Sequence, residues 1–192
     1  MSIRFAPEPK NGSTIVRAGL EKLAARRESL SSLAMEQATI EAPHAVYDLR
    51  ADEIANGGGL ETAHLSGFRY LVRKAGAAIA AAEVQTDQAG DASLLANVNY
   101  GPYVVASAMA LNELSSRALE ENYEARLLRF AAIYLVAVWL KADTASADIV
   151  YPLQPTPAGI EAGRRYTVPQ FLEAVVPLAQ KRIRNAREGQ VP

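Results

Sequence analysis

The sequence predicts an α+β fold in which a mostly antiparallel sheet is covered by an N-terminal helix, a middle helix and a C-terminal helix. Apolar residues recur at helical spacing in three separate segments, and shorter runs between them are rich in β-branched and aromatic residues, which favour strands. The chain has 192 residues, of which 49% are hydrophobic. A chain of this length buries about 70% of its unfolded surface without needing disulfides or metals. We expect a single globular domain over 13–187, a flexible leader at 1–12 and a tail at 188–192.

The first helix is predicted over residues 13–37. Ser13 is a suitable N-cap, and Val16, Leu20 and Leu23 follow at steps of three and four residues. The apolar side of this helix is expected to cover the sheet.

Three strands are predicted next, at 45–50, 68–73 and 78–85. The second and third are separated by a short glycine-containing segment and are expected to form a β-hairpin. A helix is the alternative for 77–83, because this segment is rich in alanine, the strongest helix former.

The middle helix is predicted over 102–121. Pro102 suits a first helical turn, and Val104, Ala108 and Leu111 share one face. It is the most regular amphipathic segment of the chain.

Residues 124–140 are predicted to form one strand, and 148–153 a returning antiparallel strand. The apolar run Phe130 to Leu140 has no informative period, and its β-branched and aromatic content favours a strand over a buried helix. An all-α fold remains the alternative if this run and the alanine-rich segment are both helical.

The C-terminal helix begins with a capping box. In the sequence Thr167-Val168-Pro169-Gln170, the threonine accepts from the third backbone amide and the glutamine reaches back. Phe171 and Val175 begin its apolar face, and Pro177 is expected to kink it.

Composition narrows the function. The chain has 20 basic and 21 acidic residues and no cysteine. It therefore lacks the basic excess typical of nucleic-acid binders and cannot form a cysteine-based zinc site. The N-terminal residues do not resemble a signal peptide, and the longest apolar run is shorter than the roughly 20 residues of a membrane-spanning helix. We expect a soluble, cytoplasmic protein with no membrane span and no specific nucleic-acid partner.

Motifs for catalysis or cofactor binding do not emerge. The only two histidines, His44 and His64, lack the spacing of a metal motif, and Ser66 is not in the glycine-flanked turn of a serine hydrolase. The glycines at 57–59 lack the lysine that phosphate loops require. We expect no metal and no cofactor, identify no catalytic residue, and leave open whether the protein is an enzyme.

Charge is nevertheless uneven along the chain. Residues 164–187 contain six basic residues and one acidic residue, so the remainder is net acidic. The leading hypothesis is therefore a non-enzymatic protein-interaction or assembly module that binds a protein partner or self-associates into a homo-oligomer. Its first helix or its basic C-terminal segment would form the interface, and the candidate surface residues are Arg164, Arg165, Lys181, Arg182, Arg184 and Arg187.

The alternative hypothesis is a small-molecule-binding protein or an enzyme. In either case the ligand would bind in a pocket between the sheet and the helices. Polar side chains on predicted strands need partners if they are buried, which makes them candidates to line such a pocket. The candidate residues are His64, Arg69, Tyr70, Glu83 and Arg126.

Overall fold

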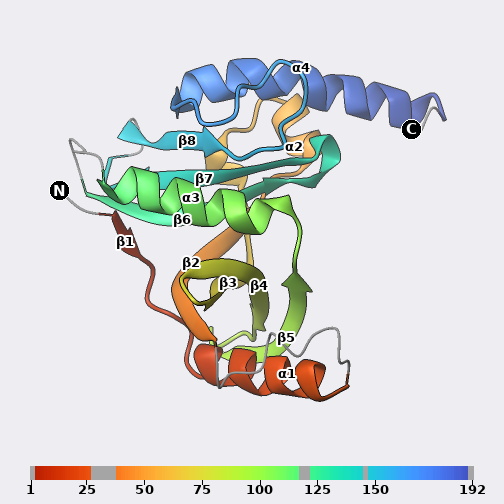
Figure 1. Cartoon of the computed structure of the whole chain (residues 1–192). Helices are drawn as coiled ribbons and strands as arrows, with labels where there is room; N and C mark the ends of the chain where they lie inside the picture. The colour runs from red at the N-terminus through yellow and green to blue at the C-terminus, as the bar shows by residue number, and fades with distance from the viewer. Residues whose placement is uncertain (1–2, 27–37, 117–121, 145–146, 190–192) are drawn as a thin grey trace.

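The computed structural model describes residues 3–26, 38–116, 122–144 and 147–189 (Figure 1). This part of the chain forms one sheet with α-helices and two short 3-10 helices. The strands are β1 (Ile3–Phe5), β2 (Thr39–Asp48), β3 (His64–Lys74), β4 (Ala77–Thr86), β5 (Ala92–Asn99), β6 (Tyr123–Phe130), β7 (Leu135–Ala142), β8 (Ile149–Pro152) and β9 (Tyr166–Thr167). The helices are α1 (Gly12–Arg26), α2 (Ala51–Ala55), η2 (Leu60–Thr62), α3 (Pro102–Ser116), η3 (Ala131–Ile133) and α4 (Val168–Arg187). The α+β class is confirmed and the all-α alternative is excluded.

The strands follow the order β5-β4-β3-β2-β6-β7-β8-β9 across the sheet, and β1 pairs with β6. All neighbours are antiparallel except β2 and β1, which each run parallel to β6. The chain thus makes a meander from β2 to β5 and returns through α3 to place β6 beside β2. This return brings side chains of β6 next to those of the β2 to β5 meander.

The helices lie on both faces of the sheet. On β3, Leu71 belongs to the core under α3, whereas its neighbours Tyr70 and Val72 belong to the core under α1. On β6, Leu127 faces α3 and Leu128 faces α4. Since successive strand residues point to opposite faces, α3 covers one face and α1 and α4 cover the other. Figure 1 shows α3 between α1 and α4.

The predicted hairpin is confirmed. β3 and β4 pair antiparallel, with Lys74 opposite Ala77. The two turn residues, Ala75 and Gly76, have φ angles of 48° and 81°. Positive φ at both central residues is the geometry of a tight hairpin turn, and glycine adopts it without strain.

The prediction of one strand over 124–140 is wrong. β6 ends at Phe130, a 3-10 turn follows, and β7 returns antiparallel so that Phe130 pairs with Leu135. Tyr134 closes the turn in the left-handed conformation, with φ 56°. The turn escaped detection because α3 and α4 bury both faces of these strands, so apolar residues run continuously through the reversal.

Further elements lie where the sequence predicted none. β5 lies between the predicted strand at 78–85 and the predicted helix at 102–121, α2 precedes the glycines at 57–59, and β1 lies within the segment predicted as a flexible leader. Phe5 of β1 packs against the core under α3, and this contact stabilises the pairing of the short strand with β6. The predicted helices over 13–37 and 102–121 begin as expected, and their ends at 27–37 and 117–121 lie outside the described residues.

The capping box of α4 is confirmed. Thr167 Oγ1 accepts from the backbone N–H of Gln170, and the Gln170 side chain accepts from the backbone N–H of Thr167. Phe171, Val175 and Ala179 are buried, and the helix continues through Pro177 to Arg187. In Figure 1 its carboxyl end extends beyond the sheet. Among the described residues, no helix is long and apolar enough to cross a membrane.

Candidate functional site

A row of polar side chains crosses four strands on the α3 face of the sheet. His44 pairs with Arg69, Arg69 with Glu83, and Glu83 with Asn97. Direct cross-strand partners lie on the same face. His44, Arg69 and Glu83 are only 2%, 3% and 8% exposed. Buried charges of this kind are costly unless they are paired.

Arg129 of β6 joins this row and is fully engaged. Its Nε and Nη2 atoms donate to the two carboxylate oxygens of Asp48, at 2.7 and 3.1 Å, and Nη1 donates to Glu83 Oε2 at 2.8 Å. Nη2 also donates to Ser66 Oγ. Burial lowers the pKa of Arg129, but the hydrogen bonds and charges of Asp48 and Glu83 outweigh it, so the net shift is upward.

Arg69 differs sharply from Arg129 in its hydrogen bonding. Its Nη1 atom lies 4.0 Å from Glu83 Oε1, which is too far for a hydrogen bond. Its Nε and Nη2 atoms are buried and have no hydrogen-bond partner among the described residues. Burial lowers the pKa of Arg69, and the Glu83 carboxylate offsets this only in part. The Nε and Nη2 donors of Arg69 are therefore buried and unpaired, whereas the same two donors of Arg129 hold a carboxylate.

A cavity of about 190 Å³ adjoins Arg69 where α3 begins. The sheet contributes Arg69, Glu83 and Arg129, and β5 contributes amide side chains. Its complete lining is Arg69, Glu83, Asn97, Asn99, Gly101, Tyr103, Val104, Arg129 and Val136. The start of α3 carries the positive end of the helix dipole, which favours negative charge.

Tyr103 fixes the mouth of this cavity. Its hydroxyl lies 2.9 Å from the Tyr134 carbonyl and 2.8 Å from the Pro155 carbonyl. These contacts tie the first turn of α3 to the turn between β6 and β7 and to the loop after β8. Burial raises the pKa of the Tyr103 hydroxyl, so it remains a neutral donor.

A second cavity, of about 290 Å³, lies along the Glu83 and Arg129 pair and is lined also by Asp48 and Ser66. Both cavities are lined by Glu83 and Arg129. The ion pair between these residues is therefore a shared wall, and its position sets the shape of both cavities.

His44 is neutral at neutral pH. Burial lowers its pKa to about 4, the nearby Arg69 charge acts in the same direction, and the hydrogen bond between Nδ1 and the Ala42 carbonyl opposes it. His64, in contrast, is at the surface, with Nε2 at 2.9 Å from Glu53. The serine beside it in sequence, Ser66, is bonded instead to Arg129 and the Val46 carbonyl.

The structure brings together two of the five predicted pocket residues, Arg69 and Glu83. His64 is exposed, and Tyr70 lies on the opposite face of the sheet, in the core under α1. Burial and the neighbouring Glu8 carboxylate raise the pKa of the Tyr70 hydroxyl. Arg126 also lies on the face opposite Arg69, in a second cationic cluster.

The predicted basic surface is divided between two places. Arg164 and Arg165 lie in the loop before β9, where Arg164 stacks on the Tyr166 ring, 4.8 Å from its centroid. Lys181, Arg182, Arg184 and Arg187 lie on the last turns of α4, beyond its last buried residue. Of these four, Lys181, Arg184 and Arg187 are exposed.

Sequence reasoning missed several residues that line the cavity or complete the charge network. They are Asp48, Asn97, Asn99, Tyr103 and Arg129. The criterion that selected Arg69, a charged residue on a predicted strand, also applies to Arg129. No local signal places Asp48 beside it.

Comparison of the chain with protein-family models, with curated proteins and with solved structures finds no match.

Proposed function

We propose that this protein binds a small ligand bearing a carboxylate in the cavity between the sheet and the start of α3, with Arg69 as the residue that binds the carboxylate. The buried, unpaired Nε and Nη2 donors of Arg69, a residue that lines this cavity, carry the proposal. A guanidinium presents these two donors in a planar fork that matches a carboxylate. Arg129 displays this arrangement within the same cluster, since the equivalent edge holds Asp48.

The energetic cost of unpaired buried donors favours a hydrogen-bond partner for Nε and Nη2 of Arg69. A buried donor without a hydrogen bond costs about 1–3 kcal/mol, and more when the group is charged. Glu83 does not supply the bond, because its Oε2 is engaged by Arg129 and its Oε1 is 4.0 Å from Arg69. A ligand carboxylate would satisfy both open donors at once.

Charge favours a carboxylate over a phosphate. Arg69 and Arg129 balance Glu83 and Asp48, so the four groups sum to zero. A carboxylate adds one negative charge, whereas a phosphate monoester adds about −1.5 to −2 near Glu83. The cavity is also smaller than the roughly 300–1,000 Å³ of pockets for drug-sized ligands, so we expect a small metabolite.

Thermal unfolding in the presence of acetate, succinate or inorganic phosphate at matched ionic strength tests this proposal. We expect a carboxylate to raise the melting temperature of the wild type and of Arg126→Met, a matched control on the opposite face, but not of Arg69→Met. Saturation at a hundredfold excess over Kd corresponds to about 2.7 kcal/mol of added stability. Arg69→Lys keeps the charge without the fork and should bind more weakly. Equal responses of the wild type and Arg69→Met would refute the proposal.

A second candidate function is self-association through the basic end of α4. Lys181, Arg184 and Arg187 are exposed on the last turns of α4, whose carboxyl end extends beyond the sheet (Figure 1), while the rest of the chain has a net acidic charge that could match them on a second copy. Sedimentation velocity tests this candidate: we expect larger species that dissociate in high salt and in the double variant Arg184→Glu, Arg187→Glu. A monomer at every salt concentration would exclude it.

A further inference from the structure

The outer edge of β5 carries one backbone hydrogen bond, from the Ala92 N–H to the Lys10 carbonyl, and beyond Ala92 the strand lacks the usual protection against pairing. β5 is the terminal strand of the sheet, so only one of its two edges is paired by a described strand. Its sequence, Ala92–Asn99, contains no charged residue and no proline, and Leu94 is 48% exposed. Charged residues and prolines normally keep edge strands from pairing with other chains. An unprotected edge is therefore a candidate site for strand addition.

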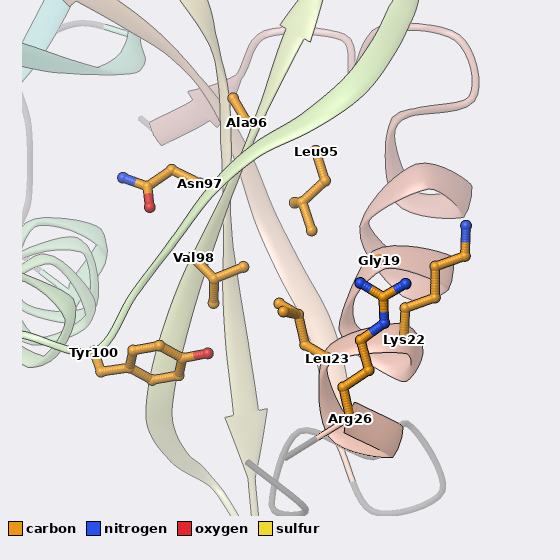
Figure 2. A pocket seen from close by; sticks show the side chains of 9 residues that line it. All are labelled: Gly19, Lys22, Leu23, Arg26, Leu95, Ala96, Asn97, Val98 and Tyr100. Carbon is orange, nitrogen blue, oxygen red and sulfur yellow. The ribbon is translucent and has the colours of Figure 1, made fainter. Parts of the chain in front are cut away.

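A groove of about 420 Å³ runs beside this strand, between β5 and α1 (Figure 2). Leu95 and Val98 line it from the strand, and Leu23 lines it from the helix. Gly19 lets the helix approach closely, because a Cβ atom at this position would lie 2.3 Å from Leu95. The floor of the groove is apolar and adjoins the open edge.

Two cations on α1 line the same groove. Lys22 and Arg26 are one helical turn apart, and Figure 2 shows both side chains on the α1 side of the groove. Within the described part of the chain, neither forms an ion pair with a carboxylate. Like charges at this spacing destabilise a helix slightly, and an external carboxylate would relieve the repulsion.

We propose that the β5 edge and this groove bind an extended peptide segment of a partner protein in which acidic and apolar residues alternate. The peptide backbone would pair with the outer edge of β5 as an added strand. Its carboxylates, all on one face of the added strand, would lie on the α1 side and meet Lys22 and Arg26, while its apolar side chains would lie on the other face beside the exposed Leu94. A second copy paired β5 to β5 fits less well, because β5 offers no carboxylate to these cations.

Fluorescence anisotropy with three synthetic peptides tests this proposal. The first alternates valine and glutamate, the second replaces each glutamate by lysine, and the third is the glutamate peptide with alternate backbone nitrogens methylated, prepared in both registers. We expect the glutamate peptide to bind at least about tenfold more tightly than the lysine peptide. N-methylation in the register that pairs with β5 should abolish binding.

Charge reversal provides the matched control. In the double variant Lys22→Glu, Arg26→Glu, the lysine peptide should bind more tightly than the glutamate peptide, while Arg126→Met should bind both as the wild type does. The proposal is overturned if no peptide binds, if both charges bind equally, or if neither methylated register loses affinity. Self-association that the glutamate peptide fails to displace would identify a second copy as the occupant and would also overturn it.

Discussion

Arg126 and Arg129 lie on the same strand, β6, but they occupy contrasting clusters on opposite faces of the sheet. On the α4 face, Arg126 lies 4.8 Å from the Tyr47 ring centroid and 5.0 Å from that of Trp139, and its Nε donates to Glu124 at 2.6 Å. On the α3 face, Arg129 holds two carboxylates while the neighbouring Arg69 keeps two open donors.

The polar groups of the α4-facing cluster are paired with one another. Trp139 Nε1 donates to Asp148 at 2.9 Å, and Lys141 lies 3.2 Å from the other oxygen of the same carboxylate. A cavity of about 290 Å³ adjoins this cluster too. Neither a buried arginine nor a cavity is thus sufficient to indicate a binding site. The unpaired Nε and Nη2 donors of Arg69 distinguish the cluster on the α3 face from this one.

The largest expected effect is that of Arg129→Met. The substitution leaves Asp48 and the buried Glu83 without their main cation, which costs about 3–5 kcal/mol for a fully buried pair. Because the Arg129 side chain is 30% exposed, we expect a loss nearer to about 3 kcal/mol. Urea unfolding at neutral pH measures it. An unchanged midpoint would show that this network is not what holds β6 to the first meander.

Acidification should destabilise the α3 face through His44. Its folded-state pKa of about 4 lies below the ordinary histidine value of 6.5, so between these values the unfolded chain binds a proton that the folded chain excludes. Stability therefore falls as the pH drops through 6.5 and levels off below about 4.

Between pH 7 and pH 5 the wild type should lose about 2 kcal/mol more than His44→Gln. Urea unfolding at the two pH values measures this difference. The same loss in His44→Gln would mean that another group is responsible.

A smaller effect is expected for Arg126→Met. The substitution removes the contacts with two aromatic rings, which are worth about 1 kcal/mol in a partly exposed site, and leaves Glu124 unpaired at the strand surface. We expect a loss of about 1 kcal/mol in urea unfolding and unchanged carboxylate binding. Loss of carboxylate binding in this variant would remove the distinction between the two faces.

The smallest effect on stability is expected for Arg69→Met, because Arg129 still pairs with Glu83 in this variant. Replacing a poorly paired buried charge by an apolar side chain of similar size is often neutral or stabilising. We expect the urea midpoint to remain the same or to rise, while carboxylate binding is lost. A loss of stability comparable to that of Arg129→Met would indicate a structural role for Arg69 instead.

Local signals made part of the fold predictable. The capping box at Thr167 and the hairpin around Gly76 depend on residues close in sequence, and both were found. The turn after Phe130 was missed because two covered faces remove the alternation of apolar and polar residues. β5 was missed because its alanine and asparagine residues favour no strand, and its position is set by pairing with β4.

The site was predictable to a smaller extent. Arg69 and Glu83 were selected because charged residues on a strand stand out in sequence. Their connection to Arg129 and Asp48 depends on the parallel pairing of β6 with β2, between residues 81 positions apart. That pairing follows from the return of the chain through α3, for which single-sequence patterns carry no signal.

The central claim is that the Nε and Nη2 edge of Arg69 binds a carboxylate. The most direct measurement is the ¹H–¹⁵N resonance of the Arg69 Nε–H group, assigned by its absence in Arg69→Met, during a titration with succinate. We predict a saturable shift of this resonance, with the Arg129 Nε–H resonance moving little because Asp48 already occupies its edge. An Arg69 resonance that does not move while succinate binds elsewhere, or that moves no more than that of Arg129, would contradict the account.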